Sequence, residues 1–286
     1  MVVPESDADM TLSMLSNPTS LGAQKHFAKT QLGLGKSIGR LSSGLRIQSA
    51  ADDAAGMGIS SVMVADMRSV AQAERNANDA ISMIQIAEGA MTEQSGIMSR
   101  LRELAIQSSN GALSNNERAF IEVEHQQLVA EIQRIAVGTE FNSFEMLGAD
   151  AGSYAMQVGK DAVGGVDTID VIFPPTHANA LGVNAMDLTT VAGSQAALGT
   201  IDAAISVLST ARADVGAYQN RLEVTVSNLR VEEENLTAAN ARIRDVDVAR
   251  ETAALTRNQI MSQAGTAMLA QANQLPSAAL QLLGSN

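Results

Sequence analysis

The sequence predicts a mainly α-helical protein, a long coiled-coil helical bundle with one small β-hairpin. The first reason is a set of aliphatic residues that recurs every seven positions in the last third of the chain, the spacing of a coiled-coil seam. The second is composition, since 2% of the residues are aromatic, none is Trp and 14 are Met. Compact cores normally rely on aromatic bulk, so a thin helical bundle fits better. The third is a single stretch of alternating apolar residues, which predicts paired strands.

Two ends that are nearly free of acid enclose an acidic middle. No Asp or Glu lies between Met10 and Ala51, and no charged side chain follows Arg257. A helix without charge on its outer face is poorly suited to water, so we expect other copies of the same chain to cover these ends. The net charge of −12 therefore lies in the middle and argues against nucleic acid, whose phosphates need a basic surface.

Three classes of structure are disfavoured by what the chain lacks. There is no Cys, which excludes disulfides, thiol chemistry and Cys-based metal sites. No run of about 18 apolar residues is present, so no membrane span is expected. The acids between Val2 and Asp9 have the wrong sign for a secretory signal. Residues 10–51 do have the composition of a mitochondrial transit peptide, and that alternative is open at this point.

The N-terminal part is predicted to be irregular to residue 20, because Pro18 disfavours a helical conformation at Asn17. A helix over residues 21–42 follows, and a bend rich in Ser and Gly covers residues 42–56. The helix and the start of the bend carry apolar residues at spacings of seven, four, three and four, which are typical of a coiled coil. These residues are Phe27, Leu34, Ile38, Leu41 and Leu45.

A long helix is predicted over residues 56–109, after Asp52 and Asp53, which fit an N-cap and first-turn pair. One face of this helix steps by three and four, and all but one of its positions are apolar. The row is Val70, Ala73, Ala77, Ala80, Ile84, Ala87, Met91, Gln94, Met98, Leu101 and Ala105.

A capping box predicts where the next helix begins. The Ser114 hydroxyl would accept the N3 amide, and Glu117 would reach back to the N-cap amide. The helix should run to about Ala136, with Gly138 as the C′ residue that ends it. Its apolar face would carry Ile121, Leu128, Ile132 and Ile135.

A β-hairpin is predicted at about residues 153–175. Two apolar runs alternate with polar or small residues, and Gly164 and Gly165 lie between them. Pro174 and Pro175 would end the second strand. The two runs are Tyr154, Met156 and Val158, then Ile169, Val171 and Phe173.

The clearest periodicity predicts a helix over about residues 194–243. Its heptad positions form a seam that needs a partner helix, because the burial of aliphatic side chains must offset the entropy of ordering the chain. The coiled-coil seam is Ile201, Leu208, Val215, Leu222, Leu229, Leu236 and Ile243. A final helix should begin near Val248, with Pro276 able to kink it.

No active site can be assembled from the sequence. The three histidines, His26, His125 and His177, lie in unlike settings, and a lone His in such a chain is more often a surface or interface group than a catalyst. The Met residues fit core filling. We therefore expect a protein that is not an enzyme and that has no catalytic residues, no cofactor and no metal site.

The chain resembles bacterial flagellins at both ends. The segment from Arg40 to Ile47 reads RLSSGLRI, and SAADDAAG follows at residues 49–56. RNAND at residues 75–79 and QAGTAMLAQANQLP at residues 263–276 match as well. The chain departs from the family pattern at Ala51, where many members have Lys, at the TLSM of residues 11–14, and in the residues that precede Met10. Met1 or Met10 could be the true start.

The resemblance implies a structural subunit that polymerises into the flagellar filament, is exported unfolded by a type III apparatus and is found outside the cell. The N- and C-terminal helices would pair as an inner domain, with residues 1–54 and 244–286 as its halves. Residues 55–243 would form the outer helical bundle with the hairpin. The chain would be a short form, because the space after Phe173 is too small for large outer domains.

The resemblance also implies partners. Other copies would form a helical homopolymer, and an export chaperone, a filament cap and hook-junction proteins would bind as well. Inner-domain assembly and chaperone binding would involve Ile260, Ala264, Met268, Leu275 and Leu280. Arg100, Leu104 and Glu124 fall where the family is read by a host Toll-like receptor, on a surface that also serves axial contacts between subunits.

Three hypotheses compete. A self-assembling flagellin leads. A flagellar hook–filament junction protein would share the terminal helices but should not carry the flagellin signature over so much of the chain. A helical enzyme or a mitochondrial coiled-coil protein has no supporting constellation of residues.

Overall fold

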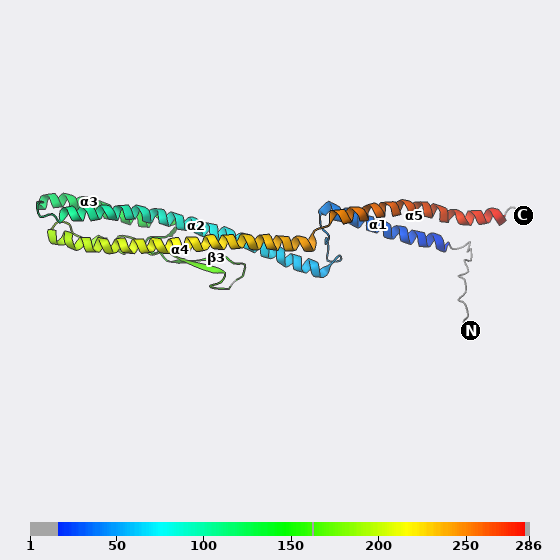
Figure 1. Cartoon of the computed structure of the whole chain (residues 1–286), viewed down its shortest axis with the longest axis horizontal. Coiled ribbons are helices and arrows are strands. Elements are labelled where there is room, and N and C mark those ends of the chain that lie inside the picture. The colour runs from blue at the N-terminus through cyan, green and yellow to red at the C-terminus, as the bar shows by residue number, and fades with distance from the viewer. Residues whose placement is uncertain (1–16, 162, 284–286) are drawn as a thin grey trace, which may run out of the picture. The chain divides into compact units, whose positions relative to one another are not determined.

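The computed structural model describes residues 17–161 and 163–283, with side chains up to residue 274. Five long helices dominate, and the short strands form two separate antiparallel sheets (Figure 1). The chain divides into two compact units. One contains the described residues up to 63 together with those from 238 onward, and the other contains residues 64–237. A mainly helical fold is therefore confirmed.

The terminal unit contains a pair of antiparallel helices, α1 (Pro18–Ser43) and α5 (Val248–Leu283), which lie side by side in Figure 1. The Asn17 side chain caps α1 by accepting from the Ser20 amide at 3.0 Å. Pro18 therefore begins this helix rather than preceding it, since Pro is compatible with the first helical turn. α5 begins at Val248, as predicted, and continues through Pro276.

Polar contacts, rather than a dry core, join the two terminal helices. Asn17 Nδ2 donates to the Ala272 carbonyl at 2.8 Å, and the Gln31 amide donates to the Ser262 hydroxyl at 3.0 Å. Gly265 lets α5 approach Phe27, because a Cβ there would lie 3.0 Å from the ring. The apolar row predicted for α1 is half-buried at best, and Ile38 is exposed.

The link between α1 and α2 (Ala54–Ser108) is an ordered bend that begins at Gly44, whose φ of 73° caps α1. Asp53 accepts from the Gly56 amide at 2.9 Å and is the N-cap of α2, as predicted. Asp52 has a different role from the first-turn one we expected. It accepts from the Ser49 amide and hydroxyl and forms an ion pair with Arg40 at 3.7 Å.

The second unit packs α2, α3 (Asn115–Gly138) and α4 (Val191–Arg244) around one hydrophobic core. Every position of the predicted row on α2 is buried, including the one polar residue, Gln94. The Gln94 amide donates to the Ile132 and Thr176 carbonyls at 3.4 and 3.3 Å. The Ala-rich row lets helices approach closely, and Met and Leu fill the spaces that remain.

The predicted capping box begins α3, with the Ser114 amide donating to Glu117 Oε2 at 2.7 Å. The predicted end of the helix is wrong in detail. Gly138 is the last helical residue, and Thr139 follows in an extended conformation. The helix therefore runs directly into strand β1 (Glu140–Phe141) and needs no left-handed C-cap.

Two hairpins follow α3. The sequence did not predict the first, in which β1 pairs with β2 (Phe144–Glu145) across Asn142 and Ser143, which have φ of 50° and 68°. Asn tolerates a positive φ, and a turn with positive φ at both central residues commonly connects the strands of a hairpin with a two-residue loop. The second hairpin is the predicted one, with β3 (Ser153–Gln157) antiparallel to β4 (Thr168–Ile172) and Met156 opposite Ile169.

After β4, the chain passes through a 3₁₀ turn, η1 (Val183–Ala185), and then begins α4. The α4 seam is buried at its first five positions, from Ile201 to Leu229. Leu236 is half-buried and packs on a small cluster of Val70, Ala73 and Leu229. Ile243 is also half-buried, so the seam as a whole is less uniformly covered within one chain than the heptad pattern predicts.

Candidate assembly and recognition surfaces

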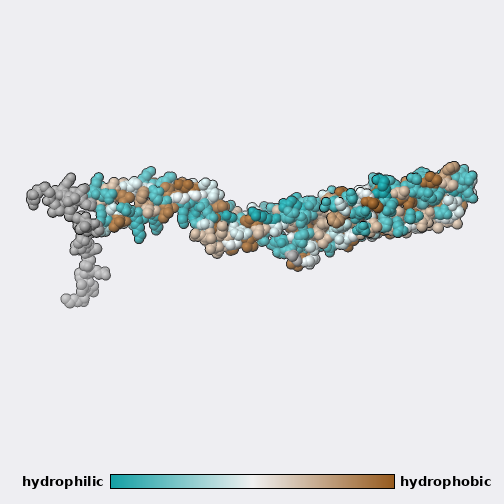
Figure 2. Space-filling view, turned by 180° about the vertical axis from the view of Figure 1, so that it is seen from behind, coloured by the Kyte–Doolittle hydropathy of each residue, from teal (hydrophilic) through white to brown (hydrophobic). Residues whose placement is uncertain are grey.

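The terminal helix pair exposes large apolar side chains and buries almost none. Within the described part of α1, the only buried side chains are Ser20 and Ser37. In α5 up to residue 274, only Ala272 is buried. Large exposed apolar residues of the pair are Leu21, Leu32, Ile38, Val248, Ile260, Met261 and Met268. Figure 2 shows hydrophobic residues, in brown, at the surface of this unit.

The residues predicted for inner-domain assembly divide into two groups. Ile260, Ala264 and Met268 are exposed on α5 and leave their side chains available to another molecule. Leu275 and Leu280 belong to the same helix, but their side chains lie outside the described residues.

A charged cluster joins α2 to α3 on the surface of the second unit. Arg100 donates from Nη2 to Glu124 Oε1 at 2.7 Å and from Nη1 to Glu103 Oε2 at 3.0 Å. The hydrogen bond to Glu124 and then the one to Glu103 raise the pKa of Arg100 above its usual value. All three side chains remain about half exposed or more, so screening by solvent keeps the contribution of these pairs to stability small.

Leu104, predicted to share this recognition surface, is 1% exposed and belongs to the hydrophobic core. Because a helix turns about 100° per residue, Leu104 lies about 40° around α2 from Arg100, toward the buried Leu101 and Ala105. The structure thus brings Arg100 and Glu124 together at the surface and places Leu104 in the hydrophobic core. Leu104 can support the surface but does not present its side chain on it.

Two exposed apolar residues of α3 lie near this cluster in the sequence. Phe120 precedes Glu124 by four positions, Val123 is adjacent to it, and both are exposed. The apolar periodicity of the sequence did not identify them, because they lie outside the buried face of α3. Such exposed aromatic bulk beside paired charges is typical of a surface that binds another protein.

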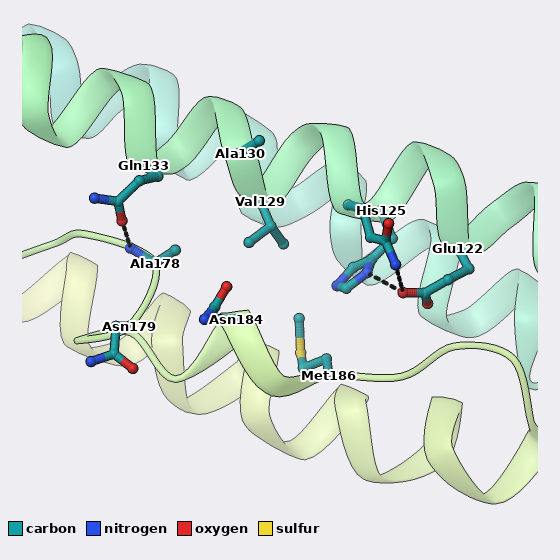
Figure 3. A pocket seen from close by; sticks show the side chains of 10 residues that line it. Glu122, His125, Val129, Ala130, Gln133, Ala178, Asn179, Asn184 and Met186 are labelled. Carbon is teal, nitrogen blue, oxygen red and sulfur yellow. Dashed lines mark hydrogen bonds and ion pairs between the residues drawn. The ribbon is translucent and has the colours of Figure 1, made fainter.

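A cavity of about 490 Å³ lies between α3 and the segment around η1 (Figure 3). Glu122 Oε2 accepts from the Leu188 amide at 2.8 Å, and Gln133 Oε1 accepts from the Ala178 amide at 3.3 Å. These two α3 side chains therefore hold the segment on the helix. Hydrogen bonds from the hydroxyl and amide of Thr189 lower the pKa of Asp187, the residue before Leu188.

His125 lines this cavity and is 2% exposed, which corrects the expectation of a surface or interface histidine. Its Nδ1 lies 3.4 Å from Glu122 Oε1, and neither ring nitrogen has a hydrogen-bond partner among the described residues. Glu122 therefore has two contacts here, because one carboxylate oxygen accepts from the Leu188 amide and the other lies beside the His125 ring.

A metal centre and a membrane span are two further classes of site that a helical bundle can hold. No group of three or more His, Asp or Glu side chains that could hold a metal ion occurs in the described part of the chain. One of its helices, α4, contains a stretch long and apolar enough to cross a membrane by composition, with a mean hydropathy of 1.3. Ile201 and Leu208 of α4 are buried in the bundle, and Asp202 pairs with Arg102 at 2.7 Å. Of that stretch, 28% is buried inside the bundle.

Comparison with known families decides between the hypotheses. Residues 14–151 match the family model of the bacterial flagellin N-terminal helical region, and residues 198–283 match that of the C-terminal helical region.

The chain belongs to the bacterial flagellin family.

Curated flagellins match over most of their length. The flagellar filament 33 kDa core protein of Treponema phagedenis is 42% identical, over 93% of this chain and 98% of the relative. A flagellin of Halalkalibacterium halodurans is 46% identical, over 87% of this chain and 91% of the relative. This flagellin is accordingly a structural subunit of the extracellular flagellar filament.

A solved structure shares the fold. The structure of a putative flagellar hook-associated protein from Vibrio parahaemolyticus has a TM-score of 0.56 and 14% identity, covering 68% of this chain and 100% of that one. At that identity the likeness concerns the helical fold alone. The flagellin sequence matches at both ends therefore carry the assignment, and the hook-junction alternative has no support of its own.

Proposed function

We propose that this flagellin polymerises through the exposed apolar faces of α1 and α5, which other copies cover in the filament. The supporting observation is that the described part of the pair buries one apolar side chain, Ala272, while Leu32 and Ile260 are 71% and 59% exposed. A helix pair without a dry core is marginal in water. Neighbouring copies would supply the missing apolar contacts at low desolvation cost, because α5 carries no charge after Arg257.

Charge substitutions on those faces test the proposal. Leu32→Asp and Ile260→Asp should each abolish or strongly slow filament growth, since a carboxylate would have to be buried between copies. Both should leave the melting of the second unit unchanged. The matched control is Val166→Asp, which also charges a highly exposed apolar residue but lies between β3 and β4. Electron microscopy and sedimentation would report growth, and wild-type growth of the two helix variants would refute the proposal.

The same faces are our proposed sites for the other flagellar partners. An export chaperone would bind the uncharged α5 segment around Ile260, Ala264, Met268, Leu275 and Leu280 before assembly. The filament cap and the hook-junction proteins would use the terminal helices at the two ends of the polymer. Export in an unfolded state through a type III apparatus is consistent with a terminal unit that has little core to unfold.

We also propose that the Arg100–Glu124 surface is read by a host Toll-like receptor. Two observations support this proposal. The Arg100 guanidinium is exposed, and the exposed apolar residues Phe120 and Val123 lie close to Glu124 in the sequence. Arg residues of this kind often anchor interfaces between proteins.

Arg100→Ala should reduce receptor signalling while leaving the melting temperature almost unchanged. Arg134→Ala is the matched control, because Arg134 pairs with Glu131 at 2.6 Å on the surface of α3. Leu104→Ala should instead lower stability by about 2–5 kcal/mol, as expected for a buried leucine. Equal signalling from Arg100→Ala, Arg134→Ala and the unmodified protein would remove the receptor proposal.

A further inference from the structure

Two methionines on α5 have side chains that are open to solvent. Met261 and Met268 are 55% and 63% exposed. They are seven residues apart, which places them one above the other on the same side of the helix. In contrast, Met91 and Met98 in the core of the second unit are fully buried.

Exposure makes these two thioethers accessible to a peroxide, more so than the other methionines whose side chains the structure describes. The sulfur lone pair attacks one oxygen of hydrogen peroxide, the O–O bond breaks, and the remaining oxygen leaves as water after proton transfer. Sulfur is oxidised to the sulfoxide and the peroxide is reduced, with no other reactant required. The product is polar and chiral, and it disrupts apolar contacts that the thioether makes.

The residues around Met261 and Met268 cannot compensate for the loss of apolar contacts on oxidation. No charged residue occurs after Arg257, so α5 has no ionic side chain there to offset a lost apolar contact. Ile260, beside Met261, is exposed as well. A face of this kind can become dry only when another molecule covers it, and a sulfoxide oxygen would then need a hydrogen-bond donor inside that contact.

We propose that Met261 and Met268 form an oxidation site that controls assembly. Oxidation of a free subunit blocks its addition to the filament, and addition to the filament shields both sulfurs from peroxide. This inference rests on the proposed polymerisation through α5. The occupant of the face is a second copy of this chain, since the family is that of a homopolymeric filament.

The test uses full-length protein and hydrogen peroxide. Free subunits and preformed filaments are exposed to the same dose, and peptide mass spectrometry follows oxidation at each methionine. Met261 and Met268 should oxidise well before Met91 and Met98 in free subunits, and much more slowly in filaments. Oxidised subunits should then fail to extend filament seeds. The double variant Met261→Leu, Met268→Leu should extend seeds normally and keep doing so after peroxide.

The outcomes separate this inference from the proposed function. If Leu32→Asp and Ile260→Asp grow like the wild type, polymerisation through these faces is wrong. If those variants fail but oxidised wild-type subunits extend seeds at the normal rate, only the oxidation site is wrong. Equal oxidation of Met261 and Met268 in subunits and filaments would also overturn it. So would loss of growth on peroxide treatment in the double Leu variant, because the sensitive group would then lie elsewhere.

Discussion

Arg118 is a buried charge whose function at the residue scale is to end a helix. It is 4% exposed and donates from Nε to the Ser108 carbonyl at 2.9 Å and from Nη2 to the Asn110 carbonyl at 2.8 Å. These carbonyls lie at and just beyond the C-terminus of α2, where the helix dipole favours a cation. Arg118 thus satisfies backbone acceptors that would otherwise be buried without partners.

Arg118→Ala should therefore destabilise the second unit by about 2 kcal/mol, the loss expected when charged hydrogen bonds to buried acceptors are removed. Chemical denaturation of the full-length protein would measure the change. Arg134→Ala, which removes an exposed arginine from the same helix, should change stability by less than about 0.5 kcal/mol. Similar effects of the two variants would show that Arg118 does not cap α2 in solution.

At the scale of single elements, α4 shows which part of a heptad row does the packing. Ile201, Leu208, Val215 and Leu222 are essentially inaccessible, whereas Leu236 is half-buried. Leu222→Asp should lower the melting temperature by several degrees, because an unpaired carboxylate would enter the core. Leu236→Asp makes the same chemical change at a wetter position and should have a clearly smaller effect. Equal melting curves for Leu222→Asp and the wild type would contradict the seam.

The stability of the first turn of α3 should depend on pH, because Glu117 of the capping box is ionisable. Hydrogen bonds from the amide and hydroxyl of Ser114 lower the pKa of Glu117 below its usual value of 4.5. Because the folded-state pKa is depressed, the stabilisation is present above the unfolded-state pKa and is lost as the pH falls through the folded-state pKa.

The stability difference between wild type and Glu117→Gln should thus shrink as the pH falls from 7 to below 4.5. Ser114→Ala should cost about 0.5–2 kcal/mol at neutral pH. A pH-independent difference between Glu117→Gln and wild type would show that the carboxylate does not take part in the cap.

The elements differed in how far sequence could predict them. Periodicity predicted the buried row of α2 and the β3–β4 hairpin, because one spacing sets both burial and secondary structure. It could not predict the β1–β2 hairpin, whose strands are too short to show alternation. It also missed the burial of His125 and Arg118, since a polar residue on an apolar face gives no sign of which backbone groups it will meet.

The candidate surfaces also contain features that the sequence could predict and features that it could not. Motif likeness predicted that Arg100 and Glu124 belong together, and the structure pairs them at 2.7 Å. It could not predict that Leu104 faces the core, because a matching motif position carries no information on helix rotation. The exposed apolar residues of α5 were expected from the absence of charge after Arg257, which is a property of composition rather than of packing.

At the scale of the whole molecule, the two units differ in how much of a hydrophobic core each one has. The second unit has a continuous hydrophobic core drawn from three helices and a hairpin. The terminal unit has a helix pair joined by polar contacts and by a small number of half-buried apolar residues. Under the proposed mode of assembly, the second unit is folded in the free subunit and the terminal helices gain most of their apolar contacts from neighbouring subunits.

Hydrogen–deuterium exchange of dilute subunits and of filaments tests this claim most directly, because amide protection reports local stability. In dilute subunits, the amides of residues 18–43 and 248–283 should exchange far faster than those of the α2 core row, and assembly should protect them strongly. The claim is contradicted if those terminal amides are already as protected in the dilute subunit as in the filament, since the helices would then be stable without neighbours.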